Sequence, residues 1–339
     1  MSKVLITGGA GFIGCNAAAR FMGKGYNVIV FDNLSRNNSD LNLQWLKEQG
    51  KFLFIKEDIR NHKALKRLFS EQKDIDVVIH LASQVAVTTS ITYPHDDFEI
   101  NALGTLNLLE AIRTTKLDPI LIYTSTNKVY GSLEDIEVVE EDTRYKYKDL
   151  PNGISEERGL DFDSPYGCSK GAGDQYVKDY SKTYGLKTVV LRASCIYGPH
   201  QFGVEDQGWI AWFVIASLMD KNIIIYGSGK QVRDVLYIND LLDAFESIIM
   251  KIETVKGHVL NIGGGLNNIV SLKELISIIE RKLGKKINYS YRESRHSDQL
   301  VYISDISRIE KHLGWKPKVD LNEGLNRLIT WLKKQERLF

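Results

Sequence analysis

The first apolar segment of the chain is followed at once by a glycine-rich turn. Residues 4–7 (VLIT) predict a buried strand, and GGAGFIG follows at 8–14. Glycines let the backbone turn tightly and approach a ligand, and a helix that begins there offers N–H groups to phosphates. The pattern predicts a strand–turn–helix unit that binds the diphosphate of a dinucleotide. The candidate binding residues are Gly8, Gly11, Phe12, Ile13 and Gly14.

An acidic residue ends the second predicted strand. Asp32 follows the apolar run 27–31, about 20 residues beyond the glycines, where a carboxylate accepts the adenosine ribose hydroxyls. This position favours NAD over NADP, whose extra phosphate Asp32 would repel, although Arg36 is able to pair with such a phosphate. The alternative is that Asp32 is an ordinary turn residue. Asp58 and Ile59 follow the third strand and flank the adenine, or Asp58 caps a helix.

The order of strands and helices predicts the fold class. Strand and helix patterns alternate through the first half of the 339 residues, which is typical of a parallel sheet covered on both faces. We expect an α/β fold: a Rossmann-type doubly wound parallel sheet in residues 1–193, and a smaller, interleaved α/β substrate domain in 194–339. Apolar segments near 231–262 are expected to return to the large sheet. The polar stretch 132–161 predicts a long surface excursion.

Composition excludes several classes of protein. The net charge is +1 with both signs evenly mixed, so no nucleic-acid partner and no anionic membrane is expected. Without a signal-like start or about 18 uninterrupted apolar residues, the chain is expected to be soluble and cytoplasmic. Cys15, Cys168 and Cys195 are too few for a disulfide framework or a metal cluster, so we interpret them as packing residues and expect no metal.

A tyrosine and a lysine are spaced for joint chemistry. Tyr166 and Lys170 are four residues apart, which places both on one face of a helix. Lys170 and a cationic nicotinamide ring would lower the pKa of Tyr166 from its usual value near 10, so that it can act as a general base toward a hydroxyl. Thr126, at the end of the strand near 122–125, would hydrogen-bond the reacting oxygen. Alone, the pair fits a solvated helix face, but the glycine turn and Thr126 favour catalysis.

Further sequence blocks carry a family resemblance. They are DNLSR at 32–36, HLASQ at 80–84, NALGT at 101–105, LR at 191–192 with YGP at 197–199, and GSGKQVRD at 227–234. With the glycine turn and YGCSK at 166–170, they make nearly the whole chain resemble the extended short-chain dehydrogenase/reductase family of nucleotide-sugar epimerases and dehydratases. The resemblance implies NAD as cofactor, a nucleotide-sugar substrate, and a homodimer or homotetramer.

The resemblance also implies site residues. In addition to those above, it assigns the cofactor to Asn33, Ser35, Leu81, Ala82, Gln84, Asn101, Thr124, Tyr166 and Lys170. It assigns the substrate to Thr126, Asn127, Gln207, Arg233, Arg295 and Asp298. Two arginines suit a diphosphate, because guanidinium groups bind phosphate in a bidentate manner. For either arginine alone, a surface ion pair is an equal alternative. Asp298 would contact the nucleotide ribose or a neighbouring strand.

The residues after Thr126 separate activities within this family. The dehydratases carry Asp-Glu there, whereas this chain has Asn127-Lys128, so dehydration is disfavoured. The blocks at 125–131, 164–172 and 207–209 resemble most the members that epimerise a CDP-hexose at carbon 2 through a transient keto sugar. One departure is Ser194-Cys195 before the YGP block, where many relatives have asparagine. A UDP-hexose 4-epimerase, a net NAD-dependent reductase and a non-catalytic dinucleotide sensor remain alternatives.

Overall fold

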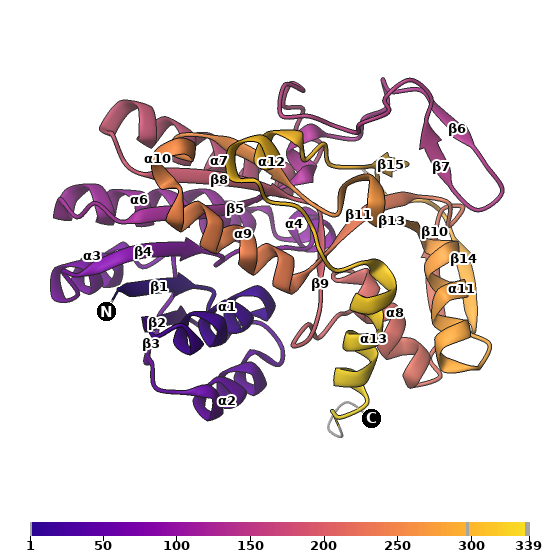
Figure 1. Cartoon of the computed structure of the whole chain (residues 1–339), viewed down its shortest axis with the longest axis horizontal. Helices are drawn as coiled ribbons and strands as arrows, with labels where there is room; N and C mark the ends of the chain where they lie inside the picture. Colours follow the sequence, from indigo (N-terminus) through magenta and orange to yellow (C-terminus); the bar gives the residue numbers. More distant parts are fainter. Residues whose placement is uncertain (1, 296–297, 336–339) are drawn as a thin grey trace.

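A seven-stranded parallel sheet forms the centre of the molecule, in the order β12-β8-β5-β4-β1-β2-β3 (Figure 1). The computed structural model describes residues 2–295 and 298–335. The strands are β1 (Lys3–Thr7), β2 (Asn27–Asp32), β3 (Leu53–Lys56), β4 (Ile75–His80), β5 (Ile120–Thr126), β8 (Thr188–Ala193) and β12 (Val259–Ile262). The family-type doubly wound α/β fold is confirmed.

Helices cover both faces of this sheet, because side chains along each strand point alternately to opposite sides. Val4 and Ile6 of β1 pack on one face, and Leu5 packs on the other. The first face is covered by α1 (Phe12–Gly23), α2 (Ser39–Gln49) and α9 (Ile238–Met250). The second is covered by α3 (His62–Glu71), α6 (Gly104–Thr115) and α7 (Pro165–Tyr184). Three shorter segments precede α6: α4 (Val87–Thr92), α5 (Pro94–Phe98) and the π-helical turn η1 (Glu99–Leu103).

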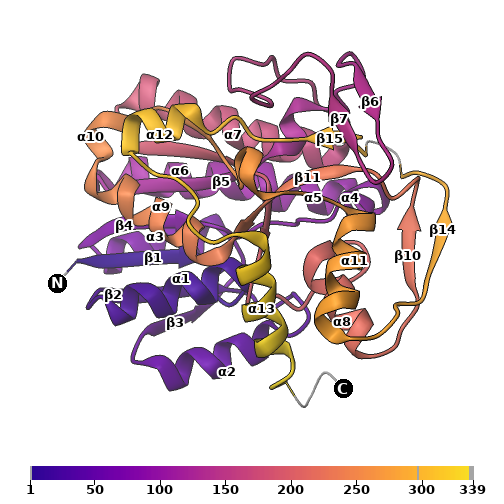
Figure 2. The ribbon, with the colours of Figure 1, turned by 45° about the vertical axis from the view of Figure 1, so that its right-hand side comes forward.

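The second half of the chain builds a smaller part beyond the carboxyl ends of the strands (Figure 2). Its strands are β9 (Cys195–Tyr197), β10 (Ile223–Tyr226), β11 (Val232–Tyr237), β13 (Ile269–Ser271), β14 (Tyr289–Arg292) and β15 (Val301–Tyr302). Its helices are α8 (Trp209–Leu218), η3 (Gly265–Asn268), α11 (Leu272–Leu283) and α13 (Leu321–Leu332). Two further helices, α10 (Ile252–Val255) and α12 (Ser307–Leu313), lie back beside the large sheet in both views.

Of the two late segments expected to join the large sheet, only one does so. β12 pairs in parallel with β8, from Val259 opposite Val190 to Ile262 opposite Ala193. The expectation for the segment near 231–238 is wrong, because β11 pairs instead with β9, β13 and β15. The position beside β8 is occupied by β12, and β11 forms the centre of a separate, smaller sheet.

The polar stretch 132–161 is more than a surface loop. It contains the antiparallel hairpin of β6 (Val138–Glu140) and β7 (Tyr145–Tyr147). Leu133, Tyr147 and Ile154 are buried with β11 and β15 in a separate apolar cluster. The excursion therefore anchors the smaller sheet near the end of β5.

Candidate active site

The glycine turn lies where the strand order of the sheet reverses, between β1 and β4. Gly8 has a φ of +67°, and a Cβ there would lie 2.7 Å from the backbone nitrogen of Ala82. A Cβ on Gly14 would lie 2.1 Å from the carbonyl oxygen of Gly8. Among the described residues, no side chain caps α1 at Gly11 and no acidic side chain occupies its first turn. The turn is thus a cradle of small residues and N–H groups at the switch point, which fits a dinucleotide diphosphate.

Asp32 joins this turn to the end of β2. Its carboxylate accepts hydrogen bonds from the backbone nitrogens of Ala10 at 3.0 Å and Leu34 at 2.8 Å. Burial raises its pKa. Each carboxylate oxygen retains a second lone pair, so these contacts leave Asp32 able to accept from ribose hydroxyls. The side chain of Asn33 donates to Asp58 at 2.8 Å, which brings together the three acidic and amide residues predicted near the adenosine.

Arg36 and Gln207 connect the two parts of the chain. The Arg36 guanidinium donates to the Gln207 side-chain oxygen, although the residues were assigned to cofactor and substrate separately. Ser35, next to Arg36, donates its backbone N–H to Asn33 Oδ1 at 2.9 Å. The loop after β2, which carries predicted cofactor residues, therefore contacts the segment before α8, which carries a predicted substrate residue.

Thr126, Tyr166 and Lys170 converge at the carboxyl ends of the central strands. Thr126 is the last residue of β5, and its side chain lies close enough to Tyr166 to lower the pKa of that phenol. Tyr166 lies in the first turn of α7, which Ser164 caps by accepting from the Gly167 N–H at 3.0 Å. A Cβ on Gly167 would lie 3.2 Å from the carbonyl oxygen of Lys128. Glycine at this position thus lets α7 start close to the Thr126–Lys128 turn.

Burial controls the ionisation of the catalytic pair. It raises the pKa of Tyr166 to about 12, against the nearby Thr126 side chain, which lowers it. It lowers the pKa of Lys170 to about 7, against the charges of Asp174 and Asp97. The Lys170 ammonium donates to the Thr124 carbonyl at 2.7 Å. The protein alone thus raises the pKa of Tyr166 instead of lowering it, so the predicted activation depends on the nicotinamide charge.

Hydrogen bonds from surrounding residues fix the loop after β4. Thr7 Oγ1 accepts from the backbone nitrogens of Leu81 at 3.2 Å and Ala82 at 3.3 Å. Gln84 donates to the carbonyl of Ala86 at 2.8 Å, and the buried Asn101 donates to the carbonyl of Gln84 at 3.1 Å. The side chains of Gln84 and Asn101 are therefore engaged in shaping the loop.

The two predicted phosphate-binding arginines are both ion-paired. Arg233, on β11, pairs with Asp298 at 2.6 Å. Arg295, after β14, pairs with Asp206 at 2.7 Å, and its guanidinium carbon lies 3.9 Å from the ring centre of Tyr226. The ion-pair alternative is therefore present in the structure at both positions. Such pairs can also hold a guanidinium ready for a phosphate.

Two residues beside the site, Lys128 and Gln299, were not assigned a role from the sequence. Lys128 is half-buried near Arg233, and burial followed by the Arg233 charge lowers its pKa to about 8. Asn127 donates to the side-chain oxygen of Gln299 at 3.2 Å. The packing role expected for the three cysteines is wrong for Cys168, which is exposed on α7. Its place in YGCSK gives no sequence signal of exposure, because its helical neighbours are buried.

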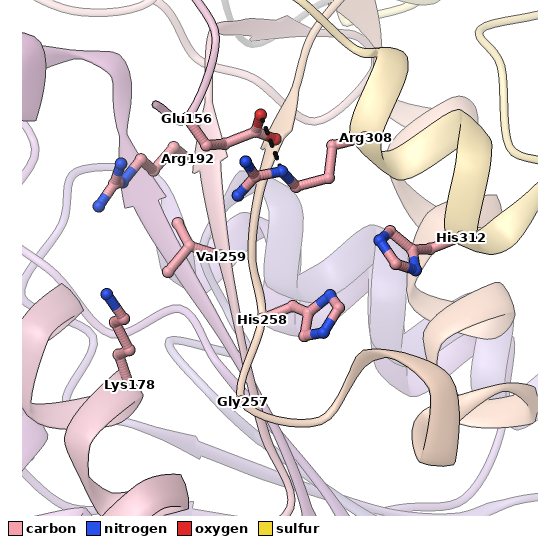
Figure 3. A pocket seen from close by; sticks show the side chains of 8 residues that line it. All are labelled: Glu156, Lys178, Arg192, Gly257, His258, Val259, Arg308 and His312. Atoms are coloured by element: carbon pink, nitrogen blue, oxygen red, sulfur yellow. Dashed lines mark ion pairs between the residues drawn. The ribbon is translucent and has the colours of Figure 1, made fainter. Parts of the chain in front are cut away.

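A hollow of about 400 Å³ lies away from the catalytic group, at the edge strand β12 (Figure 3). Lys178 on its rim is twelve residues beyond Tyr166 on α7, about 18 Å along the helix. Most of its charges are already balanced: Arg192 pairs with Asp174 at 2.9 Å, and Arg308 lies 3.5 Å from Glu156. The ion pairs in this hollow fasten α12 to the sheet. Its lining residues are Glu156, Lys178, Arg192, Gly257, His258, Val259, Arg308 and His312.

Fold and site together define an extended short-chain dehydrogenase/reductase, since the dinucleotide cradle and the Thr–Tyr–Lys group meet at one edge of a doubly wound sheet. The chain belongs to the family described as GDP-mannose 4,6 dehydratase, whose model matches residues 5–328. Its relatives include nucleotide-sugar epimerases, and the protein is an isomerase of this kind.

Three relatives illustrate the range of the family. The chain is 46% identical over 334 residues to the CDP-paratose 2-epimerase of Salmonella typhi, covering 97% of this chain and 98% of that protein. It is 34% identical to a putative UDP-glucose 4-epimerase of Methanocaldococcus jannaschii, covering 98% and 99%. The UDP-glucuronic acid 4-epimerase of Bacillus cereus, solved with UDP-glucuronic acid and NAD, superposes with a TM-score of 0.83 at 30% identity, covering 98% of this chain and 99% of that one.

Proposed function

We propose that this protein is an NAD-dependent epimerase that inverts carbon 2 of CDP-paratose to give CDP-tyvelose. The observation that carries the catalytic part is the placement of Tyr166 beside Thr126 at the end of β5, with Lys170 one helical turn further on and the glycine cradle at the switch point of the same sheet. The similarity to the Salmonella typhi enzyme, which extends over 97% of the chain, supports the choice of sugar nucleotide.

Each member of the group has a separate chemical task. Tyr166 accepts the proton of the hydroxyl at carbon 2 and later returns it, while Thr126 fixes the position of that oxygen through its hydroxyl. Lys170 provides positive charge behind the tyrosine, held by the Thr124 carbonyl. NAD supplies a hydride acceptor that is regenerated within the same turnover. Because the reaction has no net redox change, the keto sugar must stay bound until both the hydride has returned to carbon 2 and the proton has returned to its oxygen.

The residue that follows Thr126 disfavours a dehydratase reaction, in which water is eliminated from the sugar. Elimination in the dehydratases is expected to need an acid and a base beyond the threonine, and Asn127 has an amide that transfers no proton. Its side chain is instead tied to Gln299, and Thr126 donates to its amide oxygen at 3.3 Å. The residue therefore braces the threonine against the smaller part of the molecule.

Proton NMR of the purified protein with CDP-paratose and no added NAD tests this proposal. Growth of the CDP-tyvelose anomeric and carbon-2 signals is expected, because an epimerase of this type retains its cofactor. If no conversion occurs even with added NAD, the substrate assignment is wrong.

A UDP-hexose 4-epimerase is the second candidate, favoured by the likeness to the Bacillus cereus structure. The same NMR experiment with UDP-glucose and UDP-glucuronic acid distinguishes the two. Conversion of either at carbon 4, with CDP-paratose unchanged, would replace the first candidate with the second.

A further inference from the structure

A buried carboxylate lies behind the helix that carries the catalytic pair. Asp97, in α5, has an exposed fraction of 0%. Its Oδ1 accepts from the Gln84 amide at 2.7 Å and from the Asn101 amide at 3.1 Å. Its Oδ2 accepts from the hydroxyl of Ser169, the residue immediately before Lys170. A single carboxylate thus joins the loop after β4, the π-helical turn η1 and the first turns of α7.

The partners of Asp97 are all neutral. Within residues 2–295 and 298–335, no basic side chain lies within ion-pairing distance of it. Asp174, the other buried acid near Lys170, contrasts with it, because Arg192 binds Asp174 through two hydrogen bonds of 2.9 and 3.1 Å. A buried charge needs a compensating charge, or its pKa shifts toward the neutral form. Burial does raise the pKa of Asp97, and the Lys170 charge opposes that shift.

Lys170 has the complementary requirement. Its ammonium is buried and donates a hydrogen bond to the neutral Thr124 carbonyl. The same nitrogen lies 4.3 Å from the centre of the Tyr123 ring. The titratable groups around it are Asp97 from α5, Asp174 from α7, Tyr123 from β5 and His80 from β4, and Tyr166 lies one helical turn before it on α7. His80 contributes no charge, because burial lowers its pKa to about 3. Asp174 raises the pKa of Lys170 more than Asp97 does, but Asp174 is shared with Arg192. Among the described residues, Asp97 is the one of these two carboxylates whose hydrogen-bond partners are all neutral.

We propose that Asp97 is a positioning residue of the catalytic centre, whose carboxylate balances the charge of Lys170 and fastens the cofactor loop at 83–86 to the helix that carries Tyr166 and Lys170. The inference rests on the catalytic roles in the proposed function. It adds to them a residue that touches neither the substrate hydroxyl nor the reacting carbon.

The direction of the effect of Asp97→Asn follows from the sign of the charge. The Asp97 charge raises the pKa of both Lys170 and Tyr166. Without it, the lysine loses its proton at lower pH and the tyrosine ionises at lower pH. Both limbs of a bell-shaped pH profile of kcat/KM therefore move toward lower pH. A purely structural role would reduce activity without moving the limbs.

Asn can occupy this position. Its carbonyl oxygen can accept from Gln84 and Asn101, and its amide can donate to Ser169. The Ser169 hydroxyl then donates to the Tyr166 carbonyl, already 3.2 Å away. Asp96→Asn is the matched control, because Asp96 is the neighbouring residue and its side chain is 62% exposed.

The test is an ultraviolet titration of tyrosinate in the NAD-bound protein, with the Tyr166→Phe signal subtracted. Asp97→Asn is expected to move the Tyr166 titration to lower pH by roughly 1 unit, and Asp96→Asn is expected to leave it in place. No nucleotide sugar is needed, so a wrong substrate would leave this result intact. A folded Asp97→Asn protein with an unmoved titration overturns the proposal.

A second measurement keeps the inference testable if Asp97→Asn does not fold. In Lys170→Met the carboxylate loses its balancing charge, so Asp97 is expected to take up a proton. Infrared spectroscopy should then show a carboxylic acid band at neutral pH that is missing from the wild type. Loss of the band in Lys170→Met/Asp97→Asn assigns it to Asp97. An ionised Asp97 in a folded Lys170→Met protein contradicts the proposal.

Discussion

At the scale of single residues, the proposed mechanism depends most on the hydroxyl group of Tyr166, which lies beside Thr126. Replacing Tyr166 by Phe keeps the ring in its buried place but removes the group that transfers the proton. We expect turnover to fall by roughly 1,000-fold, within the range of general acid–base catalysis, while NAD stays bound. The rate is measured by NMR and the cofactor is counted after denaturation. Tyr176→Phe, on the exposed side of α7, should keep full activity; an active Tyr166→Phe enzyme would refute the proton-transfer role.

Arg233 tests the phosphate-binding role at the same scale. Its removal leaves Asp298 without its 2.6 Å partner and takes away the cation that we predict to bind the substrate diphosphate. We expect Arg233→Ala to weaken binding of CDP by about 10-fold or more, because charged hydrogen bonds contribute about 1.5–3 kcal/mol. Calorimetric titration measures the change, and Arg281→Ala in the exposed face of α11 is the control. Equal affinity in both variants would leave Arg233 only its ion pair.

At the scale of elements, the β1–α1 turn depends on close backbone packing. A methyl group at position 14 would collide with the Gly8 carbonyl at 2.1 Å, whereas a methyl group at position 23 of the same helix meets nothing within 4 Å. Gly14→Ala should lower the free energy of unfolding by about 2 kcal/mol and release NAD, because overpacking displaces the cradle. Gly23→Ala should be neutral or stabilising. Thermal unfolding and retained NAD distinguish the outcomes; equal behaviour of the two variants would contradict this account.

Elements that follow from local pattern were predictable, and those set by distant pairing were not. The strand, glycine turn and Asp32 form one continuous signal, and the spacing of Tyr166 and Lys170 fixes their common helix face. By contrast, the segments at β11 and β12 both contain short apolar runs, and they differ in pairing with strands far away in the sequence: β12 pairs with β8, and β11 pairs with β9, β13 and β15. Local pattern likewise gives no signal for the π-helical turn η1, which lies between α5 and α6. Asp97 itself resembles an ordinary acid at a helix start, so its burial had no local signal.

At the scale of the whole molecule, apolar side chains remain exposed on α5, η1 and α7. Phe98 is 56% exposed and Tyr176 is 45% exposed, and the segments that carry them pack together. We predict that this face joins two copies of the chain, as the resemblance implies. Sedimentation equilibrium should show a dimer or a multiple of it, and Phe98→Glu/Tyr176→Glu should yield monomers with unchanged thermal unfolding of the core. A monomeric wild type would contradict the prediction.

The described helices contain none that is both long and apolar enough to cross a membrane. The predicted domain boundary near residue 193 is crossed by the pairing of β12 with β8, because β12 belongs to the later half of the chain. During synthesis, β8 is complete long before its outer neighbour leaves the ribosome. Until residue 262 emerges, the growing chain carries a sheet edge of unpaired N–H and C=O groups, which invites pairing with other chains. The nucleotide-binding half is therefore expected to finish folding only when the later half has been made.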